Sequence, residues 1–314
     1  MNKLNNKTLI AVLGILISIF AITKITGNNG DRTLKETLYT IDTASIDKIV
    51  ITPMLSSENK PFSLEKNDGK WVAKQGEIED NANINIIKSA VGPFQAMKPQ
   101  RLVALNNNRW KNYEVTDSLG TKVQVYADGS LVADLMIGKF SYNNTTRKVY
   151  SFVKPANGNE VFAIDGALSS TFRQAFSAYR DKSFLKFNPS NIKSVRFDYP
   201  ADSSFVLNKM GNTWQIDGQT ADSTATANFL SKIQNKSMND FKDNFDIADK
   251  QPQFKVTFEG DNMAAIEVSC YEDESLAYIM HSTQNRNNYF TGGSINLFEE
   301  LYVSKSKFLK KENE

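Results

Sequence analysis

One alternating pattern of apolar and polar positions occurs twice in the chain. Two apolar residues and a lysine take every second position, and a tryptophan follows after four more residues. The positions are Phe62, Leu64, Lys66 and Trp71 in the first occurrence, and Phe205, Leu207, Lys209 and Trp214 in the second. Such alternation indicates a half-buried strand, and a recurring fixed spacing indicates two copies of one structural unit. We therefore expect the apolar members of both sets to lie in the cores of two similar units.

Further matched strands and turns extend the unit on both sides. Alternating segments precede the pattern at residues 46–51 and 192–197, and others follow it at residues 123–137 and 254–268. Asp68-Gly69 and Asp128-Gly129 tolerate positive φ and predict tight turns between antiparallel neighbours. Glu259-Gly260 is expected to repeat the second of these turns. The strands therefore predict largely antiparallel sheets.

Each unit is also expected to contain one longer helix. Asp80 or Asn81 would cap the first helix, whose apolar face would hold Ile84, Ile87, Val91 and Phe94, and Asp222 or Ser223 would cap the second. Short aromatic helices are expected near residues 172–179 and 297–302. Matching Phe-Leu-Lys sequences at residues 183–186 and 307–310 are expected to close the two units. The predicted fold class is α+β, with two tandem, structurally similar domains.

The first 27 residues differ from the rest of the chain. Lys3 and Lys7 precede a run of apolar or small residues over positions 9–22, with no polar face. A cleaved signal peptide and an uncleaved membrane anchor both fit this pattern. Candidate cleavage sites place isoleucine where the peptidase needs a small residue, and residues 8–26 approach the roughly 20 that span a bilayer, which favours an anchor. The lysines before the run favour a cytoplasmic amino terminus, hence a single-pass inner-membrane protein with most of the chain in the periplasm.

Composition narrows the possible partners. The chain has 314 residues, with 37 lysines and arginines against 35 acidic residues, and the charges are interspersed. No basic patch indicates nucleic-acid binding. Cys270 is the single cysteine, so no disulfide can form within the chain.

The residues needed for common catalytic mechanisms are sparse. His281 is the single histidine, and a zinc site or a nucleophilic triad needs more partners than His281 and Cys270 provide. Glycine-rich phosphate-binding motifs are absent. The acidic clusters at residues 77–80 and 272–274 are predicted to be a helix-start group and a hairpin tip. We therefore predict no enzyme activity and no catalytic, cofactor-binding or metal-binding residues.

Four stretches of sequence resemble the DUF4340 family of bacterial envelope proteins. They are Tyr39-x-Ile41-Asp42-x-x-x-Ile46-Asp47-Lys48-Ile49, Phe62-x-Leu64-x-Lys66-x-x-Gly69-x-Trp71, Trp110-x-x-Tyr113-x-Val115 and Leu135-x-Ile137-Gly138-Lys139. The resemblance covers residues 39–187 well and the second half more loosely, and Glu114 stands where the family often has glycine. It implies a single-span envelope protein associated with ABC-type export systems resembling the gliding-motility transporter.

These observations divide the chain into a membrane anchor at residues 1–27, a first DUF4340-like α+β repeat at residues 28–188 and a diverged second repeat at residues 189–314. The expected function is that of a non-enzymatic accessory or scaffold subunit beside ABC transporter permease and ATPase subunits. A binding module that holds a lipid, glycan or peptide in the cleft between the repeats is the alternative, and an unrecognised hydrolase is a third possibility.

The candidate partner surface combines aromatic and basic residues. Trp110 and Tyr113 lie in a stretch that also contains Arg109, with Arg101 a short distance before it. Aromatic and arginine side chains dominate the energetics of protein interfaces. We therefore expect these four residues to contact a partner protein.

Overall fold

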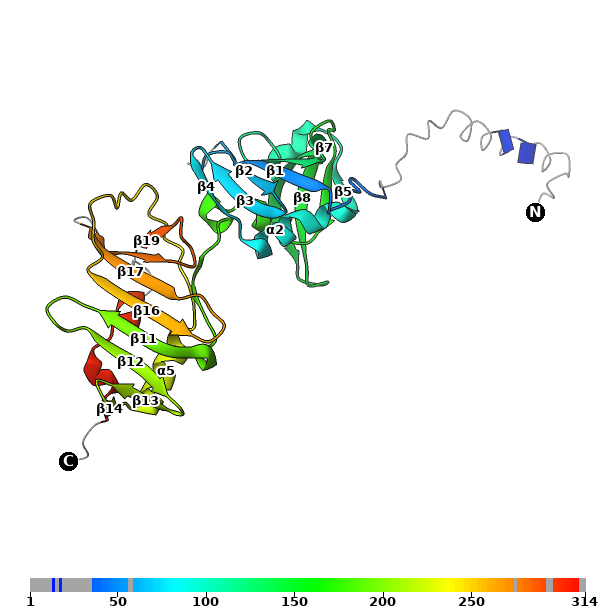
Figure 1. Ribbon diagram of the computed structural model, residues 1–314. Helices are drawn as coiled ribbons and strands as arrows, with labels where there is room; N and C mark the ends of the chain where they lie inside the picture. Colours follow the sequence, from blue (N-terminus) through cyan, green and yellow to red (C-terminus); the bar gives the residue numbers. More distant parts are fainter. Residues whose placement is uncertain are drawn as a thin grey trace.

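Two large antiparallel sheets dominate the structure, a computed structural model that describes residues 13–14, 17–18, 36–55, 59–273, 276–291 and 296–310 (Figure 1). We call them the N-terminal sheet and the C-terminal sheet. Neighbouring strands within each sheet run antiparallel to one another. The predicted sheet-rich, largely antiparallel fold is confirmed.

The N-terminal sheet has the strand order β4-β3-β2-β1-β6-β7-β8-β9-β5. Its strands are β1 (Ile46–Thr52), β2 (Phe62–Asn67), β3 (Lys70–Gln75), β4 (Ile78–Asn81), β5 (Pro99–Ala104), β6 (Thr121–Ala127), β7 (Ser130–Asn143), β8 (Lys148–Pro155) and β9 (Val161–Asp165). Its helical segments are α2 (Ile84–Val91), η1 (Gly92–Gln95), η2 (Asn107–Arg109), α3 (Trp110–Tyr113), α4 (Leu168–Phe172) and η3 (Phe176–Ala178).

The C-terminal sheet has the strand order β14-β13-β12-β11-β16-β17-β18-β19, and β10 and β15 form a separate pair. The strands are β10 (Ser183–Lys186), β11 (Ile192–Asp198), β12 (Phe205–Met210), β13 (Thr213–Ile216), β14 (Gln219–Thr220), β15 (Asn235–Ser237), β16 (Phe254–Gly260), β17 (Ile266–Asp273), β18 (Leu276–Ser282) and β19 (Tyr289–Thr291). The helical segments are η4 (Pro189–Asn191), α5 (Ser223–Ile233), α6 (Leu297–Leu301) and η5 (Lys305–Phe308).

The two sheets share their strand order and their register. Eight successive strands, from β4 to β9 in one sheet and from β14 to β19 in the other, follow one another in the same spatial sequence. The central pairs match residue by residue: Ile49 pairs with Leu64 and Val125, and Val195 pairs with Leu207 and Phe258. Both first strands also slip in register at the same place, after Ile46 and after Ile192.

Two-residue turns set this register in the N-terminal sheet. Asp68 and Gly69 have φ values of 48° and 78°, and Asp128 and Gly129 have 49° and 73°. Two successive residues in the left-handed region match the twist of antiparallel hairpins, and glycine takes that conformation without strain. The predicted turns at Asp68-Gly69 and Asp128-Gly129 are therefore present, whereas Gly260 is the last residue of β16 and the turn begins after it.

The first helix begins later than its sequence predicts. Asn83 caps α2 by accepting a hydrogen bond from the backbone N of Asn85 at 3.1 Å, whereas Asp80 and Asn81 lie in strand β4. The reason is that β4 extends the sheet by pairing with β3 as far as Asn81, so the chain turns into the helix only afterwards. Ile84 is consequently exposed, while Ile87 and Phe94 are buried. In the C-terminal half, Asp222 caps α5 as predicted.

The segments expected to close the two units have different structures. Residues 183–186 form strand β10, whereas residues 305–308 form the 3-10 helix η5. The counterpart of η5 is η3, because the backbone N of Asn83 bonds the carbonyl of Tyr179 and that of Asp222 bonds the carbonyl of Phe308, both at 2.8 Å. The aromatic segment predicted at residues 172–179 is likewise split between α4 and η3.

Each sheet has its own main hydrophobic core on one face, and α3 contributes to a smaller cluster on the other face of the N-terminal sheet. The core of the N-terminal sheet includes Ile49, Leu64 and Phe94, and that of the C-terminal sheet includes Val195, Leu207 and Phe229. Burial of apolar side chains on one face of each sheet is what the period-two sequence pattern predicts.

The predicted anchor at residues 1–27 lies outside the described residues, apart from four helical positions. Among the residues that the structure describes, no helix is both long enough and apolar enough to cross a bilayer.

The opposite face of the N-terminal sheet carries a row of alternating charges. Lys48, Glu65, Lys74 and Glu79 lie on adjacent strands, with successive N to O distances of 2.9, 3.2 and 3.1 Å. Partial burial would raise the pKa of Glu65, but hydrogen bonds from Lys48, Ser63 and Lys74 outweigh it and lower the pKa to about 2. Glu65 is thus the central acceptor of the row.

We predict that Glu65 makes stability pH-dependent between about pH 4.5 and pH 2. Because its pKa is lower in the folded state, its contribution is complete above the unfolded value and is lost as the pH falls. Glu65→Gln should therefore remove roughly 1–3 kcal/mol of the stability difference between pH 6 and pH 2.5, measured by urea unfolding at both values. Glu79→Gln, at the exposed end of the row, is the control and should change the difference little; an equal effect of the two substitutions would contradict the assignment.

Candidate functional site at the junction of the two sheets

Arg180 lies between the two sheets and bonds to both. Its guanidinium donates through Nε to Asp80 of β4, through Nη1 and Nη2 to Asp243 at 3.1 and 2.7 Å, and through Nη2 to Asn288 at 2.8 Å. The side chains of Arg180 and Asp80 are 3% and 4% exposed. We call Asp80, Arg180, Asp243 and Asn288 the Arg180 junction. It is a buried ionic cluster assembled from both halves of the chain.

The backbone hydrogen bonds change from the N-terminal half to the C-terminal half two residues after Arg180. Before it, the carbonyl of Tyr179 accepts from Asn83, and just after it the N of Asp181 donates to the carbonyl of Asn81 at 2.8 Å. From Lys182 onward the partners change, because the carbonyl of Lys182 accepts from Met238 at 2.9 Å and β10 pairs with β15. Arg180 is therefore held where the chain passes from one sheet to the other.

Aromatic rings enclose the guanidinium. The Cζ atom of Arg180 lies 3.6 Å from the ring centroid of Phe241 and 5.6 Å from that of Phe176. Phe241 in turn packs on Phe290 at 4.8 Å. A cation over a ring face that is shielded from water is attracted more strongly than at an exposed site. The rings therefore offset part of the free-energy cost of burying the charge.

Amide side chains extend the cluster along residues 181–183, which we call the linker. Asn288 donates to Asn285 at 2.8 Å, and Asn285 donates to the carbonyls of Asp181 and Ser183, both at 3.0 Å. Both asparagines are buried. The loop between β18 and β19 is thus fixed to the linker by side-chain hydrogen bonds.

The charges at the junction affect one another. Burial raises the pKa of Asp80 above its ordinary value, while the Arg180 guanidinium and Asn288 act in the opposite direction. Breaking such a pair by removing one partner leaves the other charge buried and uncompensated. Asp80 and Arg180 are therefore mutually dependent.

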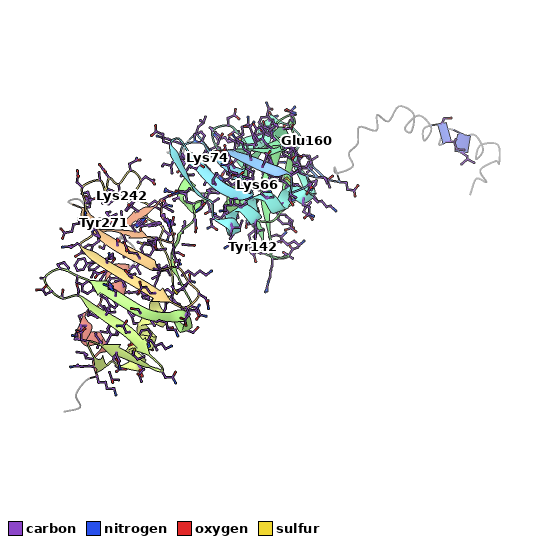
Figure 2. The ribbon with its side chains drawn as sticks, viewed as in Figure 1. Lys66, Lys74, Tyr142, Glu160, Lys242 and Tyr271 are labelled. Carbon is purple, nitrogen blue, oxygen red and sulfur yellow. The ribbon has the colours of Figure 1, made fainter. Side chains whose placement is uncertain are left out.

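A polar cavity of about 310 Å³ opens beside the junction. It is lined by Glu77, Ile78, Glu79, Asp80, Arg180, Lys242, Asp243, Asn244, Phe245, Asn287, Asn288 and Tyr289. Figure 2 labels Lys242 at this end of the C-terminal sheet. Asp80 and Asp243 both line this cavity, and both accept hydrogen bonds from Arg180. Glu79 lies in β4 and pairs with Lys74, so the acidic group predicted at the helix start belongs to a strand.

The predicted partner surface lies elsewhere, at the β5 edge of the N-terminal sheet. Trp110 is half-buried and donates from Nε1 to the carbonyl of Asn159 at 2.8 Å, and the ring of Tyr113 packs 4.6 Å from that of Phe152. Arg109 and Arg101 are exposed. The structure thus brings Trp110, Tyr113 and Arg109 together, with their aromatic rings contributing to a small second core.

The ring of Trp110 covers a buried lysine. The Nζ atom of Lys154 lies 4.6 Å from the Trp110 centroid, and Lys154 is 8% exposed. Burial lowers the pKa of Lys154, while Asp117 and Asp134 act to raise it. Part of the Trp110 surface is therefore used within the chain and is not available to a partner.

Two sequence motifs meet at Gly138. A β-carbon at this position would lie 2.0 Å from the carbonyl oxygen of Tyr113 and 2.8 Å from Cγ1 of Val115. Only glycine lets β7 approach the Trp110-x-x-Tyr113-x-Val115 segment this closely. The glycine of Leu135-x-Ile137-Gly138-Lys139 is thus explained by packing against the other motif.

Five of the six apolar residues predicted in the repeated cores are buried: Phe62, Leu64, Phe205, Leu207 and Trp214. Trp71 is half-buried and packs against the edge of the N-terminal core. The two tryptophans occupy equivalent strand positions, opposite Lys66 and Lys209, yet differ in exposure.

His281 and Cys270 lie on neighbouring strands and are used within the C-terminal sheet. The ring of His281 stacks on Tyr289 at 4.8 Å, and burial lowers its pKa. Cys270 is fully buried, and burial raises the pKa of its thiol to about 12. A protonated, buried thiol is a poor nucleophile. Within the described ranges, no group of three or more histidine, cysteine or acidic side chains is placed to bind a metal ion.

Fold and site together define a class of protein with two antiparallel sheets of matching strand order, joined by a buried arginine. A family model described as "Domain of unknown function (DUF4340)" matches residues 75–257, which is more than half of the chain. The chain therefore belongs to the DUF4340 family. The match covers Asp80, Arg180, Asp243 and Gly138, but neither the first Phe-Leu-Lys-Trp pattern nor Asn288. No curated protein and no solved structure was found to match the chain.

We predict that Arg180→Ala destabilises the protein by about 3–5 kcal/mol, because it leaves Asp80 buried without its cation. Amide hydrogen exchange should accelerate in β4 and in the loop around Asn285, which depend on the junction. Arg173→Ala is the matched control, since Arg173 bonds Glu114 at 2.7 Å and the carbonyl of Leu119 within the N-terminal half alone.

Arg173→Ala should leave exchange around Asn285 unchanged. If Arg180→Ala does not fold, the milder Asp243→Asn, at a partly exposed residue, reports the same effect. Unchanged exchange in both Arg180→Ala and Asp243→Asn would contradict the proposed coupling.

We also predict that Gly138→Ala destabilises the protein by at least about 2 kcal/mol, because its β-carbon would collide with the backbone of Tyr113. Gly92→Ala is the control, since a β-carbon at Gly92 meets no atom within 4 Å. Thermal unfolding measures both. A Gly138→Ala variant as stable as Gly92→Ala would show that the two motifs do not pack as described.

Proposed function

We propose that the two halves are copies of one α+β domain, residues 36–181 and 182–310, and that the protein is a non-enzymatic scaffold. The equal strand order, register slips and helix caps support the duplication. The segments that precede β1 and β11 support a boundary after Asp181 rather than at residues 188/189. The backbone N of Leu38 bonds the carbonyl of Met97 in the first half, and β10 pairs with β15 in the same way in the second half.

A structural role is supported most by how the junction uses its polar groups. The buried arginine, both of its carboxylates and both asparagines bond to one another or to the linker. A site built for acid–base chemistry keeps groups in reach of a substrate. Here the same groups join two domains, which suits a spacer that presents surfaces at a fixed separation.

In this proposal the first 27 residues anchor the protein in the inner membrane and the domains lie in the periplasm. The scaffold works as an accessory subunit of an ABC-type transport assembly resembling the gliding-motility transporter, whose permease and ATPase subunits would be its partners. The exposed Arg101 and Arg109, beside Trp110 and Tyr113, form the contact surface.

Detergent co-purification from native membranes tests this function. The tagged full chain should resist carbonate extraction and recover an ATPase together with a permease. Arg101→Gln/Arg109→Gln should reduce that recovery at least about fivefold, as expected for interface arginines. The control Lys70→Gln/Lys88→Gln removes the same charge from exposed positions elsewhere in the first domain and should leave the recovery unchanged. Recovery of unrelated proteins alone would contradict the transporter role.

The polar cavity favours a second candidate function, the binding of a glycan or peptide between the domains. Carboxylates and amides surround the rings of Phe245 and Tyr289, which lie 5.2 Å apart. Planar rings beside hydrogen-bonding side chains suit a polar ligand, whereas a lipid chain would need an apolar wall. Protection of Asn287 and Tyr289 from hydrogen exchange by a glycan or peptide library would support this function, and no protection would oppose it.

A further inference from the structure

The hairpin of β7 and β8 extends beyond the rest of the N-terminal sheet. Pairing of β6 with β7 ends at Ile137, and pairing of β9 with β8 ends at Tyr150. The outer residues of β7, as far as Asn143, therefore pair with β8 alone. We call residues 139–150 the β7–β8 arm; it is the green ribbon that projects from the first domain in Figure 1.

The arm is long only in the first domain. Ile137 and Cys270 are equivalent, because they pair with the first residues of β6 and β16, Thr121 and Phe254. From there β7 continues six residues to Asn143, whereas β17 continues three residues to Asp273. The arm is thus an addition to the shared architecture.

The composition of the arm is basic and aromatic. Residues 139–150 contain Lys139, Arg147 and Lys148, three aromatic residues and no acidic residue. Lys148 pairs with Asp165 at 3.2 Å, but among the described residues neither Lys139 nor Arg147 forms an ion pair. The guanidinium of Arg101 adds a further positive charge, 5.9 Å from the ring of Tyr150.

Two of the aromatic side chains are exposed. Phe140 is 57% exposed and Tyr142 is 52% exposed, and two residues apart on one strand they share a face. Figure 2 labels Tyr142 on this part of the domain. The tip is nevertheless ordered, because Asn143 accepts from the backbone of Thr145 and Thr146 at 2.9 and 3.0 Å. The fold therefore holds two large apolar rings in solvent on an ordered support.

The base of the arm lies at the same end of the sheet as Leu38 and Tyr39, which belong to the segment before β1. Pro99, Ile164, Ser151 and Phe140 are paired in succession across β5, β9, β8 and β7. Met97, just before Pro99, bonds Leu38 and Tyr39. Three strand spacings, about 15 Å, therefore separate Pro99 from the base of the arm, and Leu38 and Tyr39 are bonded beside Pro99.

From this arrangement we infer that the β7–β8 arm lies against the membrane, with Phe140 and Tyr142 at the interface and Lys139 and Arg147 on anionic phospholipid headgroups. The inference rests on the proposed anchor. Eight residues separate that anchor from Glu36, and they span at most about 30 Å, so the first domain stays close to the bilayer. Aromatic and basic side chains are those that prefer the interface and attract anionic lipid.

Site-specific fluorescence in nanodiscs tests the inference with the full chain. An environment-sensitive fluorophore is attached at Tyr142→Cys, with Met210→Cys, an exposed β12 position in the second domain, as the control. The native Cys270 is buried and does not compete for the label. In nanodiscs containing phosphatidylglycerol, quencher-bearing lipids should quench the label at position 142 and not the label at position 210.

Charge variants identify the headgroup contribution. Lys139→Gln/Arg147→Gln should reduce the ratio of membrane-bound to free arm about tenfold, and so should high salt. Lys70→Gln/Lys88→Gln should not change it. Equal quenching at positions 142 and 210 in inserted protein would overturn the inference while leaving the anchor intact. Recovery of the chain outside the nanodiscs, with no quenching, would overturn both the inference and the anchor.

A protein partner is the remaining alternative for the arm. If the label at position 142 shifts its emission in native membranes but not in nanodiscs that hold no other protein, with or without phosphatidylglycerol, the arm binds a protein and the lipid assignment is wrong. A shift in such nanodiscs that depends on anionic lipid supports the assignment.

Discussion

The burial of one arginine between two sheets is the constraint on which the rest of this structure depends. Removing a guanidinium from water is costly unless its hydrogen bonds are replaced, and Arg180 replaces them with two carboxylates and an amide drawn from both halves. Phe241 covers one face of the charge. The arrangement satisfies Arg180 only when both sheets are present in one relative position, so a local requirement fixes a global geometry.

This constraint joins two sheets whose hydrophobic cores are separate. Each sheet buries its own apolar face, and nothing in either core requires the other. A polar junction adds directionality that an apolar contact lacks, because hydrogen bonds hold only in one geometry. If the junction holds, the exposed residues near Trp110 and the β7–β8 arm keep fixed positions relative to the C-terminal sheet.

Features of the fold that depend on neighbouring residues could be predicted from the sequence, whereas the junction could not. Alternation in β2 and β12 and the Asp-Gly turns are local, so these strands and the hairpins at those turns could be predicted from them, whereas the complete strand order of the sheets could not. The cap of α2 was misplaced because pairing of β4 with β3, a tertiary interaction, carried Asp80 into a strand. Arg180 bonds residues 63 and 108 positions away, at separations that leave no periodic signal. Trp71 and Trp214 matched in sequence but differ in exposure, since their surroundings differ.

The distance between the two sheets in solution tests the central claim most directly. Spin labels at Leu131→Cys and Met210→Cys, both exposed strand positions, report it by pulsed electron resonance without interference from the buried Cys270. If the Arg180 junction fixes the two sheets, the full chain gives one narrow distance distribution that matches the structure. A broad distribution, as from two domains on a flexible linker, would contradict the account.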